Sequence, residues 1–197
     1  MTTTIFETST KERPKMSKIW KSNFAMKLSC PAYKSDNPDP YRMEVYKALH
    51  EQLRLQYRKK MIDDGWHIIE TEMPIENDVV KGKIDDVFQS REGIVTAVDY
   101  VSSNVPKMYK LLDTAISAGY LRHELDTDAS GRVVSRGGVV TEIPNELIEG
   151  TWSTMTSEYF QKILSLSADE LLQYANPASG ICTYCANKEC RKKPPKS

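Results

Sequence analysis

Hydrophobic side chains recur every three or four residues between residues 41 and 61, which predicts the clearest helix of the chain. The inward face of this helix would carry Tyr46, His50, Leu53 and Tyr57. Weaker patterns of the same period predict three further helices, over residues 16–33, 106–121 and 153–175.

Between the helices the pattern changes to the alternation that is typical of strands. Three successive strands are expected, and the polar stretch at 89–93 fits a hairpin loop between the last two. A later strand-like segment is interrupted by Gly137-Gly138. The order of helices and strands predicts an α/β fold, in which helices flank a mixed central sheet. The expected strands cover residues 66–75, 79–88, 94–101 and 133–143.

The length of 197 residues predicts one domain, which we place at 16–193 between a disordered tail at 1–15 and a short tail at 194–197. No apolar run approaches the roughly 20 residues that cross a membrane, and the polar N-terminus lacks the hydrophobic segment of a secretory signal. We therefore expect no membrane contact and a cytoplasmic location, in the host cytoplasm if the source is a virus.

Four cysteines are the strongest chemical signal in the sequence. Cys182, Cys185 and Cys190 lie close together near the C-terminus, whereas Cys30 precedes them by about 150 residues. Two residues between thiols allow both to bind one metal centre. Disulfides are rare in the cytoplasm, so this spacing favours a metal ion or an iron–sulfur cluster, and both accept four thiolates. If Cys30 completes the set, the two ends of the chain are joined.

The formal net charge is zero, but the cations are concentrated at the two ends of the chain. Seven lie between residues 11 and 34, and five lie between residues 188 and 196. Cysteines that join the ends would bring these segments together into a basic patch that attracts phosphate groups. The alternative is a pair of solvated tails.

Two aspartates on the predicted hairpin are candidate metal ligands. Asp99 lies among apolar neighbours, where a carboxylate is costly unless it is paired or bound to metal. Strand pairing would bring Asp85 close to it, and a divalent cation would relieve their repulsion. His50 could be a third ligand. Alternatively, His50 is a core histidine, Asp85 is a solvated group, and Asp99 caps the next turn.

These features together resemble the PD-(D/E)XK nuclease core, and more closely the RecB-like iron–sulfur exonucleases of the CRISPR-associated Cas-four type. The order of the motifs matches over roughly residues 17–193. The residues that carry the resemblance are Cys30-Pro31, His50-Glu51, Gly82-Lys83-Ile84-Asp85, Val98-Asp99-Tyr100-Val101-Ser102-Ser103, and the three terminal cysteines Cys182, Cys185 and Cys190.

The resemblance implies a restriction-endonuclease-like core and a structural four-iron four-sulfur cluster on the four cysteines, with zinc as the alternative. It also implies a Mg²⁺ or Mn²⁺ site made by His50, Asp85, Asp99 and the backbone carbonyl of Tyr100. The implied activity is the hydrolysis of DNA, at ends or in single strands.

One departure from the family pattern bears directly on activity. The family carries a lysine two residues after the second acid, where this chain has Val101. That lysine positions the attacking water and stabilises charge on the phosphate, and valine does neither. The Gln-x-x-x-Tyr element of the following helix is not visible either. Hydrolysis is therefore expected to be impaired, unless Lys83 or Lys110 substitutes for the missing lysine.

Three hypotheses follow from the sequence. The first is a metal-dependent DNA nuclease. The second is a protein without catalysis on a nuclease scaffold, which binds DNA or a partner from a CRISPR or replication and recombination complex, and which a virus or mobile element could use as a decoy. The third is a zinc protein in which four cysteines have a structural role and the aspartates are incidental.

Overall fold

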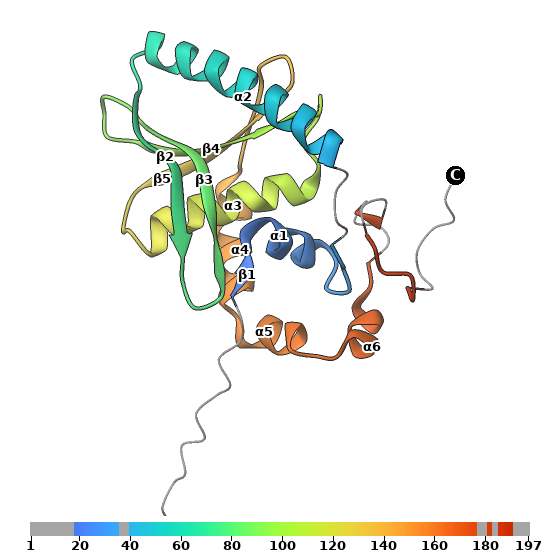
Figure 1. The fold of residues 1–197 in the computed structure, drawn as a ribbon. Helices are drawn as coiled ribbons and strands as arrows, with labels where there is room; N and C mark the ends of the chain where they lie inside the picture. Colours follow the sequence, from blue (N-terminus) through green and yellow to red (C-terminus); the bar gives the residue numbers. More distant parts are fainter. Residues whose placement is uncertain (1–17, 36–39, 177–180, 183–184, 191–197) are drawn as a thin grey trace, which may run out of the picture.

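The computed structural model describes residues 18–35, 40–176, 181–182 and 185–190 (Figure 1). The expected tails at 1–15 and 194–197 lie outside these residues. In the described part of the chain, six strands form one mixed sheet in the order β1-β3-β4-β5-β6, and β2 pairs with the same β3. The strands are β1 (Ile19–Trp20), β2 (His67–Glu76), β3 (Val80–Gln89), β4 (Val95–Val101), β5 (Ala129–Ser135) and β6 (Val139–Glu142).

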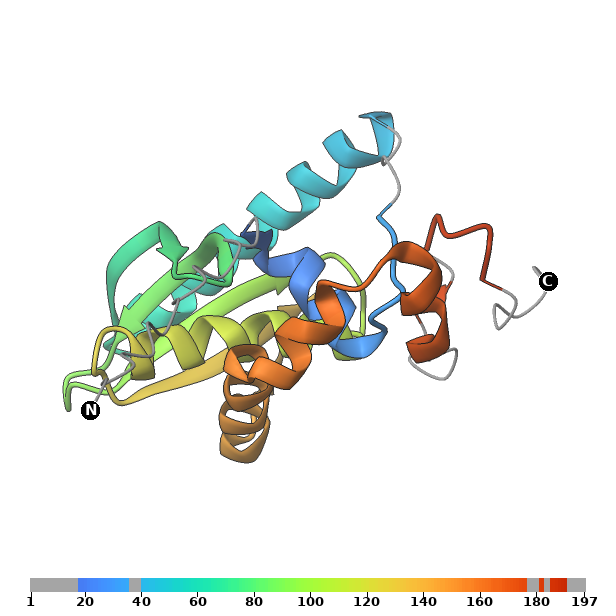
Figure 2. The ribbon, with the colours of Figure 1, turned by 90° about the horizontal axis from the view of Figure 1, so that it is seen from below.

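The helices cover both faces of this sheet (Figures 1 and 2). One face packs against α2 through an apolar cluster that includes Leu53, Tyr57 and Phe88. A larger core on the other face joins the sheet to α1, α3, α4 and α5. No helix within the described residues is both long enough and apolar enough to span a membrane. The helices are α1 (Lys21–Ser29), α2 (Pro40–Asp63), α3 (Met108–His123), α4 (Asn145–Thr156), α5 (Glu158–Leu164) and α6 (Ala168–Leu171), and a 3₁₀ turn (Leu172–Tyr174) follows.

The predicted α/β class, the helix at 41–61, the three-strand run and the helix at 106–121 are confirmed. The predicted inward face of α2 is only partly right, because Leu53 and Tyr57 are buried whereas Tyr46 is 50% exposed. The strand expected from residue 133 begins earlier, at Ala129, and the break at Gly137-Gly138 separates β5 from β6.

Two predicted helices have the wrong bounds. The segment at 16–33 contains a short strand before α1, which begins only at Lys21. The expected helix at 153–175 begins earlier, as α4, and is then interrupted twice. Both interruptions have a local cause, since the hydroxyls of Ser157 and Ser167 accept backbone N–H groups and start new helices there.

The ladder between β3 and β4 ends at the pair Asp86 and Val98. At the next position Asp85 does not continue the pairing, and its Oδ2 instead accepts the backbone N–H of Tyr100 at 3.0 Å. From there, within the described residues, β4 pairs only with β5, and β3 pairs with β2 and β1. The two strands that carry the predicted aspartates therefore separate at Asp85.

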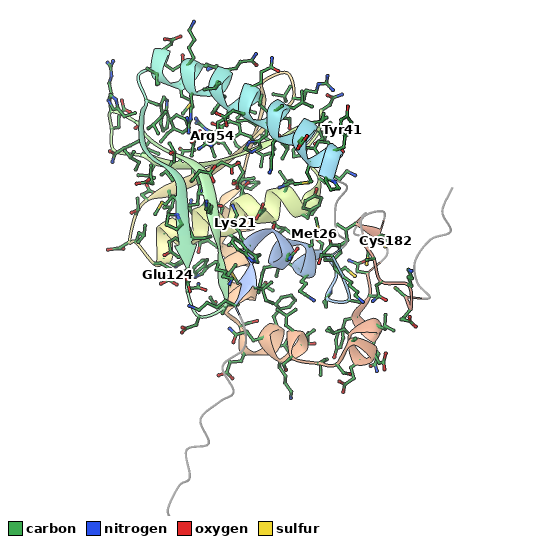
Figure 3. The ribbon with its side chains drawn as sticks, viewed as in Figure 1. Lys21, Met26, Tyr41, Arg54, Glu124 and Cys182 are labelled. Carbon is green, nitrogen blue, oxygen red and sulfur yellow. The ribbon has the colours of Figure 1, made fainter. Side chains whose placement is uncertain are left out.

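The carboxylate of Asp86 attaches α2 to the sheet. Asp86 is fully buried and accepts hydrogen bonds from the guanidinium groups of Arg54 and Arg58, at 2.5–3.2 Å, and from the hydroxyl of Tyr100 at 2.7 Å. Arg54 also donates to the carbonyl of Asp85. Figure 3 shows Arg54 between α2 and the strands. These bonds satisfy a charge that burial would otherwise penalise.

We predict that Asp86→Ala lowers the free energy of unfolding by about 3–5 kcal/mol, because it leaves Arg54 buried without its main partner. Urea unfolding followed by circular dichroism measures this loss. Asp78→Asn, at an exposed position between β2 and β3, is the matched control and should change stability by less than about 0.5 kcal/mol. Equal stability of Asp86→Ala and the wild type would contradict the role given to Asp86.

Candidate functional site

A solvent-open pocket of about 210 Å³ lies where β3 and β4 separate. The pocket is lined by residues from α1, α2, the two strands and α3. The five residues predicted as catalytic from the sequence all line it: His50, Lys83, Asp85, Asp99 and Lys110. The fold therefore brings together groups that are up to 60 residues apart in the sequence.

On one side of the pocket, His50 Nε2 lies 3.0 Å from Asp85 Oδ2. This hydrogen bond raises the pKa of His50 above its ordinary value, although partial burial opposes the rise. Burial raises the pKa of Asp85, but His50, the charge of Lys21 and the N–H of Tyr100 outweigh it and lower the pKa overall. His50 and Asp85 thus form a charge-assisted pair.

On the other side, the ammonium of Lys21 binds the second predicted aspartate. Lys21 Nζ lies 3.0 Å and 3.3 Å from the two carboxylate oxygens of Asp99, and it donates to Ser117 Oγ at 2.7 Å. Lys21 is only 5% exposed. Burial lowers its pKa, but Asp113 and Asp99 outweigh burial and raise it well above the ordinary value, so Lys21 is charged at neutral pH.

Gly82 allows α1 to approach the sheet closely enough for this contact. A Cβ atom at Gly82 would lie 2.7 Å from the Cβ of Lys21, which is closer than side chains pack. Figure 3 shows Lys21 at the start of α1, next to β3. The position of the ammonium is therefore fixed by backbone packing as well as by charge.

A third carboxylate, Asp113 on α3, completes the acidic group. Its Oδ1 lies 3.7 Å from Lys21 Nζ, and its Oδ2 lies 3.5 Å from Lys110 Nζ. Among the described residues, the buried Oδ1 atom has no hydrogen-bond partner. Burial raises the pKa of Asp99, and the neighbouring Asp85 and Asp113 add to this rise, while Lys21 opposes it. Asp99 and Asp113 thus face the two ammonium groups of Lys21 and Lys110, while Asp85 is paired with His50.

The carboxylate oxygens at this pocket are suitable ligands for a hard divalent cation, but they are not arranged to coordinate one. Carboxylate oxygens are the ligands that Mg²⁺ and Mn²⁺ prefer, and Asp113 Oδ1 is an unsatisfied oxygen of this kind. However, no three His, Cys, Asp or Glu side chains in the described ranges are grouped to hold one ion. Both oxygens of Asp99 contact Lys21 instead. An ion shared by Asp85 and Asp99 would require that contact to open.

The other predicted residues have mixed positions. Lys83 is exposed, and its Nζ lies 3.6 Å from Glu72 Oε2. Lys110 contacts Asp113. Val101, at the position of the family lysine, packs into the main apolar core. Tyr100 lines the pocket and donates its backbone N–H to Asp85, and the metal contact expected of its carbonyl stays a prediction.

Sequence reasoning missed Lys21, Asp113 and Ser117. A signal for each was present. Lys21 lies three residues before Phe24, and therefore on the apolar face of its own predicted helix. Asp113 and Ser117 are polar residues four positions apart within an apolar helical run, which places them on one face.

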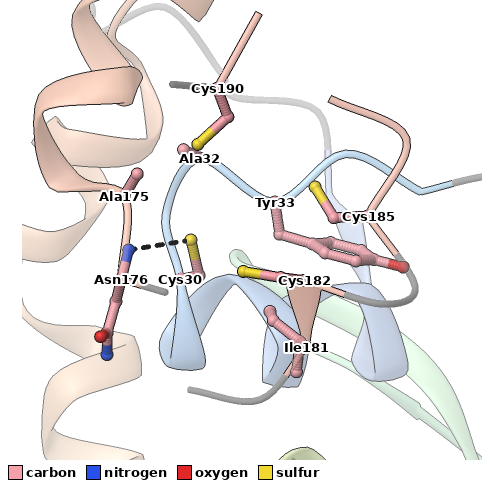
Figure 4. A pocket seen from close by; sticks show the side chains of 9 residues that line it. All are labelled: Cys30, Ala32, Tyr33, Ala175, Asn176, Ile181, Cys182, Cys185 and Cys190. Atoms are coloured by element: carbon pink, nitrogen blue, oxygen red, sulfur yellow. Dashed lines mark hydrogen bonds between the residues drawn. The ribbon is translucent and has the colours of Figure 1, made fainter. Parts of the chain in front are cut away.

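The four cysteines line a second pocket, at the end of α1 (Figure 4). None of the four forms a disulfide, and the sulfur atoms of Cys30 and Cys182 point into the same space. Hydrogen bonds join the two ends of the chain here, since Ala186 N–H donates to the carbonyl of Lys34 at 2.9 Å. The prediction that distant segments meet around the cysteines is therefore confirmed for these residues.

The surroundings of the thiols fit the thiolate ligands of a metal centre. Backbone N–H groups of Asn176 and Asn187 donate to the sulfurs of Cys30 and Cys185, at 3.3 Å and 3.5 Å, and such bonds stabilise metal-bound thiolates. Apolar side chains surround the pocket. The thiols line a common pocket but, in the described residues, no three are close enough to bind a single ion. Cys30, Cys182, Cys185 and Cys190 are the residues that would hold a cluster, and a bound cluster would join the two ends of the chain.

The chain was compared with protein-family models and with curated proteins. No protein-family model matches the chain, and no curated protein matches it. The resemblance to iron–sulfur nucleases therefore depends on the motif residues of the chain and stays a prediction.

We predict that anaerobically purified protein contains iron and sulfide in the proportions of one cubane cluster and absorbs at about 400 nm. Cys30→Ser should lose both the iron and the absorption, because it removes the one ligand that comes from the N-terminal segment. Ser29→Ala, at the neighbouring position, is the control and should retain them. Stoichiometric zinc without iron in the wild-type protein would contradict the cluster and favour a structural zinc site.

Proposed function

We propose that this chain is a DNA-binding protein on the scaffold of a RecB-like iron–sulfur nuclease, and that metal-dependent cleavage of DNA by it is impaired. The observation that carries this proposal is the contact of Lys21 with both oxygens of Asp99. An ammonium there occupies the carboxylate that a catalytic ion would need. The loss of the family lysine at Val101 points to the same impairment.

The nuclease scaffold is supported by the arrangement of the motif residues. His50, Asp85 and Asp99 lie around one pocket, which opens where two sheet strands separate. The four cysteines meet at a second pocket beyond the opposite end of α1, although they come from both ends of the chain. If the protein were a zinc protein with incidental aspartates, there would be no reason for His50, Asp85 and Asp99 to line one pocket.

DNA as the ligand is supported by the cations at the mouth of the pocket and at the joined chain ends. Lys83 is exposed beside the carboxylates, and Lys110 lines the same pocket. Near the cysteines, the exposed Lys34 belongs to the segment that contacts Ala186 and Asn187. Such cations neutralise phosphates without reading the base sequence.

A second candidate function is an active nuclease in which Lys21 replaces the family lysine. Asp113 Oδ1 favours it, because a cation bound there would satisfy a buried carboxylate oxygen that has no hydrogen-bond partner among the described residues. In that case Asp85 and Asp99 would hold the ion that activates water for attack on the phosphodiester. Lys21 would then stabilise charge on the phosphate in the transition state.

One substitution separates these functions. Because Lys21→Met removes the ammonium and frees Asp99, we predict that it strengthens Mn²⁺ binding by about tenfold or more, equivalent to about 1.4 kcal/mol. Isothermal titration measures the affinity, and degradation of an end-labelled single strand in Mn²⁺ measures cleavage on the same samples. The wild type should bind the oligonucleotide and cleave it slowly or not at all.

The control is Lys60→Met, which removes an exposed lysine that pairs with Asp64 at the far end of α2. It should change neither Mn²⁺ affinity nor cleavage. If the wild type cleaves efficiently and Lys21→Met reduces the rate about 100–1000-fold, Lys21 is a catalytic residue and the impaired-site proposal is wrong. Restoring a lysine at position 101 is a poorer test, since Val101 packs in the core.

A further inference from the structure

Trp20 is an exposed aromatic side chain at the mouth of the acidic pocket. Its residue is 54% exposed, whereas Trp152 is buried and Trp66 is only partly exposed. Trp20 lines the pocket together with Asp85, Asp99 and Asp113. We propose that the indole of Trp20 is a stacking platform for one base of a single DNA strand that enters this pocket. This inference rests on the proposed DNA binding.

The backbone holds Trp20 in place before any ligand arrives. Trp20 pairs with Lys81 in the short parallel ladder between β1 and β3, and Ile19 N–H donates to the carbonyl of Val79 at 3.1 Å. The next residue, Lys21, is fixed among buried carboxylates. The indole thus projects from an ordered strand end, and a base that stacks on it loses little protein entropy.

Cations lie where the sugar-phosphate backbone of such a strand would run. Lys81 Nζ lies over one face of the Trp20 ring, 5.5 Å from its centroid, and Lys83 follows two positions later on β3. Alternate residues of a strand share a face and are about 6.6 Å apart. The order Lys81, Lys83, Asp85 therefore forms a row that leads from the indole to the acidic pocket.

Carboxylates near this row only partly neutralise it. Glu72 lies 3.6 Å from Lys83, and Glu76, which lies opposite Lys81 in the β2–β3 ladder, is shared with Lys18 at 2.7 Å. The remaining positive charge suits phosphates, and the indole suits a base that is free to stack. In a duplex each base is already stacked on its neighbours, so this arrangement favours a single strand.

The test is the binding of a fluorescein-labelled oligothymidylate and of a duplex of the same length, measured by anisotropy in EDTA at fixed salt. Trp20→Ala should weaken single-strand binding by about tenfold and change duplex binding by less than twofold, because only the single strand offers a free base. Trp20→Tyr should retain most of the affinity, since tyrosine also stacks. Tyr159→Ala, which removes another exposed aromatic residue outside the pocket, should bind like the wild type.

The contribution of Lys81 and Lys83 can be measured separately, from the salt dependence of binding. The double variant Lys81→Gln and Lys83→Gln should weaken single-strand binding and reduce the slope of log affinity against log salt by roughly 0.7 for each phosphate that the protein no longer neutralises. Trp20→Ala should leave that slope unchanged, because stacking releases no counterions. This difference separates a stacking role of Trp20 from general damage to the pocket.

Each outcome decides the inference. If the wild type binds the single strand and Trp20→Ala binds it equally well, the platform is wrong while the proposed DNA binding stands. Equal losses for single strand and duplex would assign Trp20 a structural role and also overturn the platform. If the wild type binds neither probe, both the platform and the proposed function fail.

Discussion

The pairing of one buried ammonium with two buried carboxylates is the constraint on which the rest of the site depends. Lys21 and its partners Asp99 and Asp113 are each almost fully buried. Each such charge loses several kcal/mol of hydration, which only close opposite charges can offset. The start of α1 must therefore remain against β4 and α3, and Gly82 provides the space for it.

Neighbouring aspartates on β3 have separate roles because the strand pairing ends between them. Asp86 belongs to the last pair with β4, and its charge attaches α2 to the sheet. Asp85 lies just beyond that pair, in the space that opens between the strands, and its partner is His50. The structural charge network thus places α2, and α2 presents His50 to the pocket.

Much of the fold could be predicted from the sequence because its signals are local. The apolar run of β4 reflects a strand that is buried along its whole length, and the helical period of α3 comes from burying one face of a single helix. The helix predicted at 153–175 failed for an equally local reason, since hydroxyl caps at Ser157 and Ser167 start new helices within it. The predicted burial of Tyr46 was wrong because α2 extends past the sheet, and the periodicity of a helix does not reveal where its neighbours end.

The site was predicted in part, and what was missed is informative. Motif spacing identified His50, Asp85 and Asp99, which do line one pocket. It could not identify Lys21 as the partner of Asp99, because that contact spans 78 positions and depends on a glycine that lets a helix approach a strand. Lys83 and Lys110, the substitute lysines expected from the sequence, are nearer in sequence to the aspartates. The fold instead supplies the ammonium from the other end of the domain.

The most direct test of this account is a crystal structure of the protein grown with Mn²⁺, with the ion located by its anomalous scattering. The account predicts Lys21 Nζ in contact with Asp99 and no manganese between Asp85 and Asp99. A fully occupied manganese ion bridging those two carboxylates, with the lysine displaced from Asp99, would contradict it.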